Sequence, residues 1–319
     1  MNSKHIRIIF LGTPEFAAHS LESLAAHGYN IVAAVTAPDK PAGRGQQIQK
    51  SAVKISAEKY NIPVLQPEKL KSQEFIDQLR ELNPDLMIVV AFRMLPEVVW
   101  NMPKMGTFNL HASLLPDYRG AAPINWAIIN GETKTGITTF FLRHEIDTGN
   151  IIFQEEIEIG ENENAGSLHD RMMIAGADLI CKTVDAIAIG NAPSIDQRSL
   201  IKEGKLPKEA PKLFRETSRI NWSNDGNSIR NHIRGLSPYP GAWTEMKNGE
   251  EPAVAVKIFS AKFSNANHQL PIGTVTDDFS VAVKDGWIKV EEIQVPGKKR
   301  LSISEFLKGF KKNATLQFQ

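Results

Sequence analysis

An amide and an imidazole lie two residues apart in the stretch FNLHASLLPDYRGAAPI, at the end of an apolar run. Side chains of an extended chain alternate between its two faces, so Asn109 and His111 share one face of a predicted strand. His111 can take a proton from a nucleophile near neutral pH. Asn109 can donate a hydrogen bond to an oxygen that becomes negative as a carbonyl carbon turns tetrahedral. These residue types at this spacing are therefore typical of chemistry at a carbonyl carbon.

The same two side chains have an alternative role, which is to satisfy backbone polar groups where a sheet ends. Three features favour a functional site instead. The two residues share a face, they end a strand of a predicted α/β sheet, and a turn through a proline follows directly. The carboxyl edge of such a sheet is where ligands bind.

A third group is expected to hold the imidazole or a water molecule in place. The candidates downstream are His144, Glu145, Asp147, His169 and Asp170. Asp147 is the best placed, because it lies in the turn IDTGN between two predicted strands, and such a turn can bring a carboxylate over a sheet edge. The alternative role of Asp147 is that of an Asx-turn residue.

Three other kinds of site are disfavoured. The stretch FLGTPEF (10–16) lies where a dinucleotide-binding fingerprint would be, but it contains only Gly12, and Glu15 would repel a phosphate at the start of the helix. The histidines and the single cysteine lack the spacing of metal ligands, so no metal is expected. A serine hydrolase is disfavoured because the sequence lacks a G-x-S-x-G elbow around its nucleophile.

The composition is that of an ordinary soluble protein of two domains, with 319 residues, 42% of them apolar and 23% charged. One cysteine, Cys181, favours a reducing, cytoplasmic location. The sequence shows neither a signal peptide nor an apolar run that could cross a membrane, so no membrane partner is expected. Residues 208–319 carry a net charge of +5 and the rest carries −4, which favours a polyanionic partner for the C-terminal part.

Strand-like and helix-like segments alternate over the first two-thirds of the chain, which predicts an α/β fold built on a doubly wound, mostly parallel sheet. Closely spaced strand-like runs after the short helix DGNSIRNHIRGL predict a small C-terminal β-barrel of the OB-like type. We therefore expect a catalytic domain over residues 1–190, a linker over 191–207 and the barrel over 208–319. Residues 39–49 are interpreted as a loop, in which glycines on either side of Arg44 would let the backbone conform to a phosphate-bearing ligand.

The stretch NLHASLLPDYRGAAPI (109–124) resembles the active-site signature of the folate-dependent formyltransferases. Further matches run through the chain in the family's order; they are RIIFLGTPEFA (7–17), TAPDKPAGRG (36–45), EIDTGNII (145–152), APKLFRETSRINW (210–222) and IRGLSPYPGAW (233–243). The resemblance implies a Rossmann-like formyltransferase fold. It also implies 10-formyltetrahydrofolate as the formyl donor and the α-amine of a methionyl initiator tRNA as the acceptor.

Residue roles follow from the same resemblance. The matched motifs imply a catalytic trio of Asn109, His111 and Asp147. They imply a folate-contacting segment of Ser113, Leu114, Leu115 and Pro116, and a folate-pocket segment that includes Ala91, Phe92 and Met94. They imply tRNA contacts from the loop and its flank, at Lys40, Arg44 and Lys50, and from the C-terminal barrel.

Two details of these segments are singled out. Arg93 stands where the family more often has a glycine, so we expect the residues around it to contact the pterin through their backbone. Leu115–Pro116 is expected to be a cis peptide bond, because the chain must turn sharply there.

A related enzyme that formylates a small amine, such as a glycinamide nucleotide or an amino sugar, would keep the trio. It would lack the arginine-bearing loop and the basic C-terminal barrel, so a tRNA acceptor is favoured. A non-catalytic RNA-binding protein on the same scaffold would have lost members of the trio. We therefore expect a cytoplasmic, monomeric formyltransferase that acts on tRNA.

Overall fold

The computed structural model describes residues 2–42, 47–201, 203–313 and 315–319. The chain divides into two compact units. Unit 1 comprises residues 1–120, 136–157 and 169–208, and unit 2 comprises residues 121–135, 158–168 and 209–319. The chain therefore passes between the units more than once, and the expected boundaries of catalytic domain, linker and barrel stay a prediction.

The main sheet has seven strands in the order β10-β9-β7-β6-β1-β2-β5. Its strands are β1 (Ile8–Gly12), β2 (Ile31–Val35), β5 (Val64–Leu65), β6 (Leu86–Val90), β7 (Thr107–His111), β9 (Lys134–Phe141) and β10 (Ile151–Glu158). The five strands from β7 to β5 are parallel, whereas β9 pairs with β7 in the antiparallel direction. Strands β1 and β6 are buried along their whole length, because helices cover both faces of a parallel sheet.

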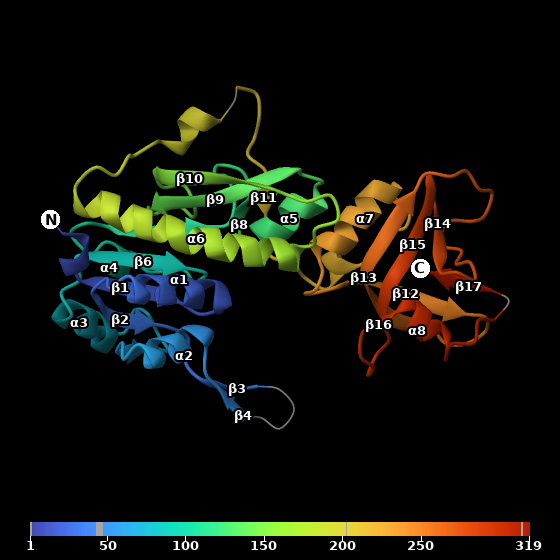
Figure 1. Ribbon diagram of the computed structural model, residues 1–319, viewed down its shortest axis with the longest axis horizontal. Coiled ribbons are helices and arrows are strands. Elements are labelled where there is room, and N and C mark those ends of the chain that lie inside the picture. The colour runs from blue at the N-terminus through green and yellow to red at the C-terminus, as the bar shows by residue number, and fades with distance from the viewer. Residues whose placement is uncertain (1, 43–46, 202, 314) are drawn as a thin grey trace. The chain divides into compact units, whose positions relative to one another are not determined.

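Different helices pack on the two faces of this sheet. The helices associated with it are α1 (Glu15–Ala26), α2 (Ala52–Lys59), α3 (Gln73–Glu81), α4 (Glu97–Trp100) and α6 (Ala165–Ala188), with short 3-10 helices at Ser3–His5 and Gln197–Leu200. Phe75 of α3 and Val99 of α4 pack in one core cluster with Val89 of β6. On the opposite face, α6 runs along the strands, and Gly176 lies so close to Leu110 that a Cβ there would be 2.7 Å from its side chain (Figure 1). This arrangement confirms the predicted doubly wound, mostly parallel sheet.

The segment at residues 39–49 is not an open loop. Strands β3 (Lys40–Ala42) and β4 (Gln47–Gln49) pair in antiparallel fashion, with Lys40 opposite Gln49. Glycines between two short extended runs are a hairpin signal, which the sequence-based interpretation as a loop passed over. Residues 43–46, Arg44 among them, lie outside the described part of the chain.

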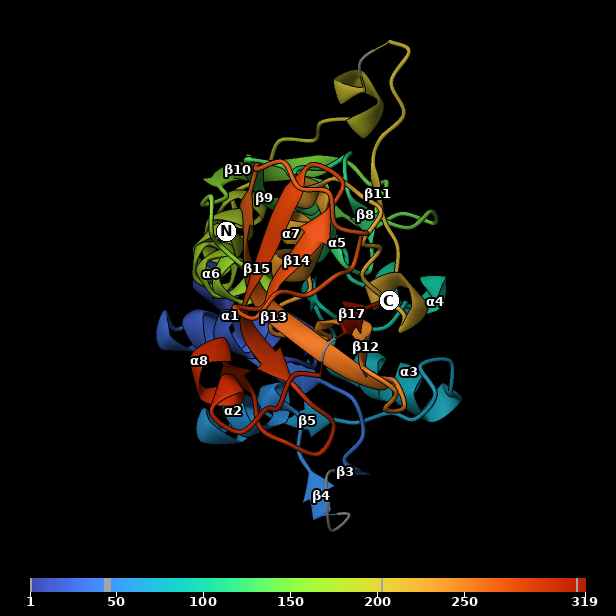
Figure 2. The same cartoon turned by 90° about the vertical axis from the view of Figure 1, so that its right-hand side faces the viewer.

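Unit 2 is built on a nearly closed antiparallel sheet in the order β14-β15-β13-β12-β17, with β16 paired to β15 (Figure 2). Its strands are β12 (Ala242–Asn248), β13 (Val254–Ser264), β14 (Ser280–Val283), β15 (Gly286–Gln294), β16 (Leu301–Ser302) and β17 (Leu316–Phe318). Buried positions alternate with more exposed ones along β12, as expected for a strand with one face in a core. The predicted small C-terminal barrel is confirmed.

Helices complete unit 2. They are α5 (Pro123–Ile129), α7 (Gly226–Gly235) and α8 (Ile303–Leu307), with a 3-10 helix at Glu216–Ser218; the two-residue strands β8 (Arg119–Gly120) and β11 (Glu209–Ala210) complete the elements of the chain. The side-chain amide of Asn125 donates to the carbonyl of Gly235 at 2.8 Å, which joins α5 to α7. None of the helices in the described part of the chain has the length and apolar character needed to cross a membrane.

Candidate active site

His111 ends strand β7, and its ring has a defined orientation and tautomer. The side chain is 8% exposed, and its Nε2 lies 2.8 Å from the carbonyl oxygen of Tyr118. A carbonyl oxygen can only accept, so Nε2 carries the hydrogen and Nδ1 carries the free lone pair of the neutral ring. The ring nitrogen able to take a proton is therefore Nδ1.

Asp147 meets this nitrogen from another part of the chain. It lies in the connection between β9 and β10, and its Oδ2 is 4.0 Å from Nδ1 of His111. The same oxygen accepts a hydrogen bond from the backbone N–H of Gly120 at 3.1 Å. The carboxylate thus faces the basic nitrogen of the imidazole, where it can stabilise the positive charge of a protonated ring. The geometry brings His111 and Asp147 together, as the sequence predicts.

Asn109 lies two residues before His111 on β7 and is half-buried. Its strand neighbours in register are Val89 of β6 and Phe140 of β9. The amide therefore lies on the same face of the sheet as the imidazole, one residue pair further from the carboxyl end of the strand.

Three of the other downstream candidates, His144, His169 and Asp170, have different neighbours. The side chain of His144 is 89% exposed, and its ring nitrogen is 3.9 Å from Glu97. His169 lies on α6, where its ring packs edge-on against Phe16 and its Nδ1 is 3.1 Å from Asp170. Of the five candidates, Asp147 is the one whose carboxylate contacts the His111 ring in the described part of the chain.

The segment after β7 is a tightly bonded turn. Ser113 is fully buried, and its hydroxyl donates to the carbonyl of Asp117 at 2.7 Å. The backbone N–H of Leu115 donates to Thr138, and the Gln154 amide donates to the carbonyl of Leu115. The Leu115–Pro116 peptide bond is cis, which confirms the prediction. The Ser113 hydroxyl thus stabilises the turn that contains it.

The segment after β6, residues 91–94, leaves the sheet close to the end of β7, which carries Asn109 and His111. Val90 is in register with Leu110, so the residues that follow it, from Ala91 to Met94, begin beside the end of β7. Ala91 is exposed and has a left-handed backbone, with φ of +44°. Met94 is 72% exposed, whereas Phe92 packs partly against the core.

Arg93, which the resemblance singled out, has defined partners. Its guanidinium donates to the backbone carbonyls of Pro67 and Glu68, the latter at 2.9 Å. It also lies 5.6 Å from the ring centroid of Phe92. The larger side chain is therefore held against the segment that precedes α3.

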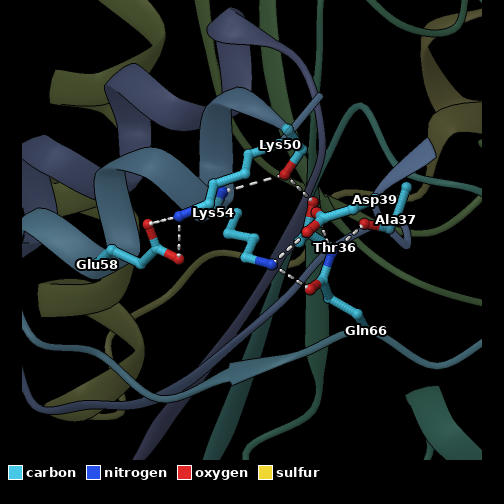
Figure 3. A network of polar contacts seen from close by, with 8 residues as sticks. Thr36, Ala37, Asp39, Lys50, Lys54, Glu58 and Gln66 are labelled. Atoms are coloured by element: carbon cyan, nitrogen blue, oxygen red, sulfur yellow. Dashed lines mark hydrogen bonds and ion pairs between the residues drawn. The ribbon is translucent and has the colours of Figure 1, made fainter. Parts of the chain in front are cut away.

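A polar network holds the base of the β3–β4 hairpin (Figure 3). Lys54 of α2 contacts Asp39 at 2.5 Å and Gln66 at 2.7 Å, and its hydrogen bond is the main cause that lowers the pKa of Asp39. Lys50, one of the residues predicted to contact tRNA, pairs with Glu58 at 2.7 Å. Lys40, another of them, is exposed on β3, whereas Arg44 is outside the described residues.

The side chains that could ligate a metal ion are scattered. Among residues 2–42, 47–201, 203–313 and 315–319, no three or more histidine, cysteine, aspartate or glutamate side chains are grouped so that they could hold a metal ion.

Sequence reasoning missed two partners of the trio, the carbonyl of Tyr118 and the N–H of Gly120. Both are backbone groups, which carry no side-chain signature. Their nearness to His111 and Asp147 depends on the path of the turn between residues 113 and 120.

Comparison with known proteins places this fold and site in a family. Residues 6–184 match the formyl transferase family, and residues 212–311 match the formyl transferase C-terminal domain. The chain belongs to the formyl transferase family. It is 54% identical over 315 residues to the methionyl-tRNA formyltransferase of Bacteroides thetaiotaomicron, with 98% of each chain covered. The resemblance inferred from the motifs is thereby confirmed.

Two solved structures share the fold. HypX from Aquifex aeolicus in complex with tetrahydrofolic acid superposes with a TM-score of 0.62 at 17% identity, covering 99% of this chain and 51% of that one. The N-formyltransferase from Helicobacter canadensis, in complex with folinic acid and dTDP-3-aminofucose, gives a TM-score of 0.62 at 20% identity, covering 93% of this chain and 100% of that one. At these identities the likeness concerns the formyl transferase fold.

Proposed function

We propose that this formyl transferase moves the formyl group of 10-formyltetrahydrofolate to the α-amine of methionyl initiator tRNA, giving N-formylmethionyl-tRNA for translation initiation. The observation that carries the proposal is the 54% identity, across 98% of both chains, to a relative named methionyl-tRNA formyltransferase. This likeness extends over both compact units, so it includes the part of the chain proposed to recognise the tRNA.

The trio supplies the groups that the reaction needs. His111 takes the proton of the attacking amine at Nδ1, because Nε2 is occupied by the Tyr118 carbonyl. It can then pass this proton to the folate nitrogen whose bond to the formyl carbon breaks. Asp147, whose carboxylate is 4.0 Å from Nδ1, stabilises the resulting imidazolium. Asn109 donates its amide hydrogen to the oxygen on which negative charge develops. An aminoacyl ester has a less basic amine than an ordinary α-amine, so the nucleophile is available in its neutral form.

The donor, when bound, supplies the formyl carbon. The residues proposed to hold it are Ala91, Phe92 and Met94 after β6, and the Ser113–Pro116 segment after β7. These two segments follow adjacent parallel strands, and the carboxyl edge of such a sheet is a general ligand site. The exposed apolar side chain of Met94 and the exposed backbone at Ala91 suit a flat ring with polar edges. The buried hydroxyl of Ser113 supports its own turn, so this segment offers the donor its backbone and the side chains of the residues that follow.

The tRNA is proposed to contact both units. Lys40, Arg44 and Lys50 of the hairpin region contact the acceptor stem, and the barrel in residues 208–319, with a net charge of +5, contacts the phosphate backbone. Lys50 exchanges its ion pair with Glu58 for a phosphate in this arrangement. The protein is proposed to act in the cytoplasm as a monomer, without a metal cofactor.

The deciding experiment is a formyl-transfer assay with three acceptors in parallel. Methionyl initiator tRNA, methionyl elongator tRNA and a small amine, such as an amino-sugar nucleotide or glycinamide ribonucleotide, are each offered with 10-formyltetrahydrofolate. We expect formylation of the initiator tRNA in preference to the other two. Transfer to the small amine without transfer to either tRNA would contradict the proposal and would favour the small-amine alternative.

A further inference from the structure

Gln197 is a buried amide whose hydrogen-bonding capacity is fully used at the active-site turn. It begins the 3-10 helix Gln197–Leu200 and is 1% exposed. Its Nε2 donates to the carbonyls of Asp147 and Gly149, each at 2.8 Å. Its Oε1 accepts from Nε and Nη2 of Arg119, at 3.2 and 2.5 Å. Both N–H groups and both oxygen lone pairs of the amide are therefore engaged.

These contacts are part of a closed ring of interactions that passes through Asp147. Arg119 orients the Gln197 amide, which bonds the backbone of Asp147. The next residue, Gly120, donates its N–H to the carboxylate of the same aspartate at 3.1 Å. The Arg119–Gly120 dipeptide thus holds the backbone of Asp147 through Gln197 and holds its carboxylate directly.

Asp147 needs such support because its backbone is left-handed, with φ of +53°. Residues other than glycine adopt this region rarely, and a tight site must hold them there. Without the two hydrogen bonds from Gln197, the turn can relax toward a more common backbone conformation. The carboxylate would then move relative to Nδ1 of His111.

The segment that carries Gln197 is itself anchored in unit 1. The backbones of Ile195 and Ile151 exchange two hydrogen bonds, at 2.8 and 2.9 Å. Asp196 accepts from the N–H of Arg198 and pairs with its guanidinium at 2.6 Å, which starts the 3-10 helix at Gln197. This part of the expected linker is therefore joined to the strand that follows the Asp147 turn.

We propose that Gln197 is a positioning residue for Asp147, so that the segment after α6 completes the catalytic site. It acts through Asp147, which holds its carboxylate against the ring nitrogen that takes the proton. The prediction for activity rests on the proposed formyl-transfer function, whereas the prediction for the His111 ring does not.

The test compares variants of the full chain. Gln197→Met keeps the volume and the neutral charge but removes all four hydrogen bonds. Gln197→Asn keeps the amide on a side chain one methylene shorter, and it serves if the first variant folds poorly. Asp147→Asn is the reference for loss of the carboxylate charge. Tyr29→Phe is the matched control, because it removes a hydroxyl that bonds Asp185 at 2.9 Å, next to the amino end of β2.

The first readout is the NMR spectrum of the His111 ring at a fixed pH, which needs no substrate. The chemical shifts of the ring depend on the groups around it, so a displaced Asp147 carboxylate changes them. Both Gln197 variants are expected to move the His111 ring signals in the same direction as Asp147→Asn, by a smaller amount. Tyr29→Phe is expected to lower the melting temperature and leave the His111 ring signals unchanged.

The second readout is the steady-state rate at neutral pH. Misplacement of a catalytic group by about 1 Å costs up to about 100-fold in rate, so kcat of Gln197→Met should fall toward that limit while KM changes little. In the Asp147→Asn background the same substitution should have almost no further effect, because the two residues act as one unit.

An unchanged His111 ring spectrum in both Gln197 variants, or additive losses of kcat, would overturn the positioning role. If the wild type formylates no methionyl-tRNA while the His111 ring signals still move in the Gln197 variants, the proposed function fails and the positioning role stands. If the wild type is active while these ring signals do not move, the positioning role fails alone.

Discussion

At the scale of single residues, the chemistry depends on which nitrogen of His111 is free. The Tyr118 carbonyl, 2.8 Å from Nε2, assigns the hydrogen of the neutral ring to that atom. Nδ1 is left free and is the atom that we propose as the base, and the Asp147 carboxylate lies 4.0 Å from it, where it would stabilise a protonated ring. Two neighbours thus orient the ring of the proposed base.

Replacing His111 by alanine removes the proposed general base. We expect His111→Ala to lower kcat by about 100-fold to 10,000-fold, the usual contribution of general base catalysis. The dissociation constant for methionyl-tRNA should change little, because phosphate contacts dominate nucleic-acid affinity. A variant with near-normal turnover in the transfer assay would refute the assignment of His111 as the base.

Asp196 provides a test of pH dependence. The hydrogen bond from the Arg198 side chain, followed by the one from the Arg198 backbone, lowers the pKa of Asp196 to about 2. The pKa in the unfolded chain is about 3.9, so the carboxylate stabilises the fold fully above that pH. This contribution is lost as pH falls from about 4 through about 2.

NMR titration of the Asp196 carboxyl and thermal melts of wild type and Asp196→Asn measure this effect. The difference in melting temperature should be largest above pH 5 and should shrink as the pH approaches 3. A difference that stays constant between pH 6 and pH 3 would show that the Asp196 charge is not involved.

At the scale of elements, the connection between β9 and β10 decides where the carboxylate lies. The N–H of Phe141 donates to the carbonyl of Asn150 at 3.0 Å, which closes the connection at its base. Gly149 packs against the backbone of Phe141, since a Cβ at Gly149 would lie 1.6 Å from the carbonyl oxygen of Phe141. Gln197 bonds the same turn through the carbonyl of Gly149. The turn is therefore defined by close packing as well as by hydrogen bonds.

Gly149→Ala is expected to distort this turn. Because the added Cβ would clash with backbone atoms, the clash can be relieved only by movement of the chain. We therefore expect a loss of about 2–4 kcal/mol in the free energy of unfolding, together with a lower kcat. Gly190→Ala is the control: its φ is +72° and a Cβ there meets nothing within 4 Å, so only the backbone cost of about 1–2 kcal/mol applies. Equal losses in the two variants, measured by denaturant unfolding, would contradict the packing argument.

At the scale of the whole molecule, charge divides unevenly along the chain. Residues 208–319 carry +5 and the remainder carries −4. A polyanion binds such a basic region mainly by releasing counterions, so its affinity falls as salt rises. Exposed lysines that could contact phosphates lie in unit 2, for example Lys298 and Lys299 in the turn between β15 and β16.

Neutralising these lysines tests the proposed tRNA-binding role of the barrel. Lys298→Gln combined with Lys299→Gln should weaken tRNA binding and reduce the slope of log affinity against log salt by about one for each lysine that pairs with a phosphate. Arg80→Gln is the control, because Arg80 is an exposed arginine of α3 that already pairs with Asp77 at 2.9 Å. A salt slope unchanged by the double substitution would exclude these two lysines from the tRNA-binding surface.

Local patterns were sufficient to predict much of the fold and part of the site. Buried runs such as Ile8–Gly12 and Leu86–Val90 predict parallel strands, and the alternation within Ala242–Asn248 predicts a strand with one buried face. The pairing of β3 with β4 was missed, because strands of only three residues lack a repeating pattern and the glycines between them were interpreted as loop residues. Gln197 was missed because it lies in a stretch without periodicity, interpreted as a linker.

The sequence by itself determined that an amide and an imidazole share a strand face, because alternation along an extended chain is a local property. It also determined the family, because the motifs occur in a set order along the chain. The tertiary structure alone decided which carboxylate meets the imidazole, which ring nitrogen is free, and that Gln197 bonds the turn of Asp147. The bonds that hold Asp147 join residues 27 to 50 positions apart, and only the packing of strands and turns brings such distant groups within hydrogen-bonding reach.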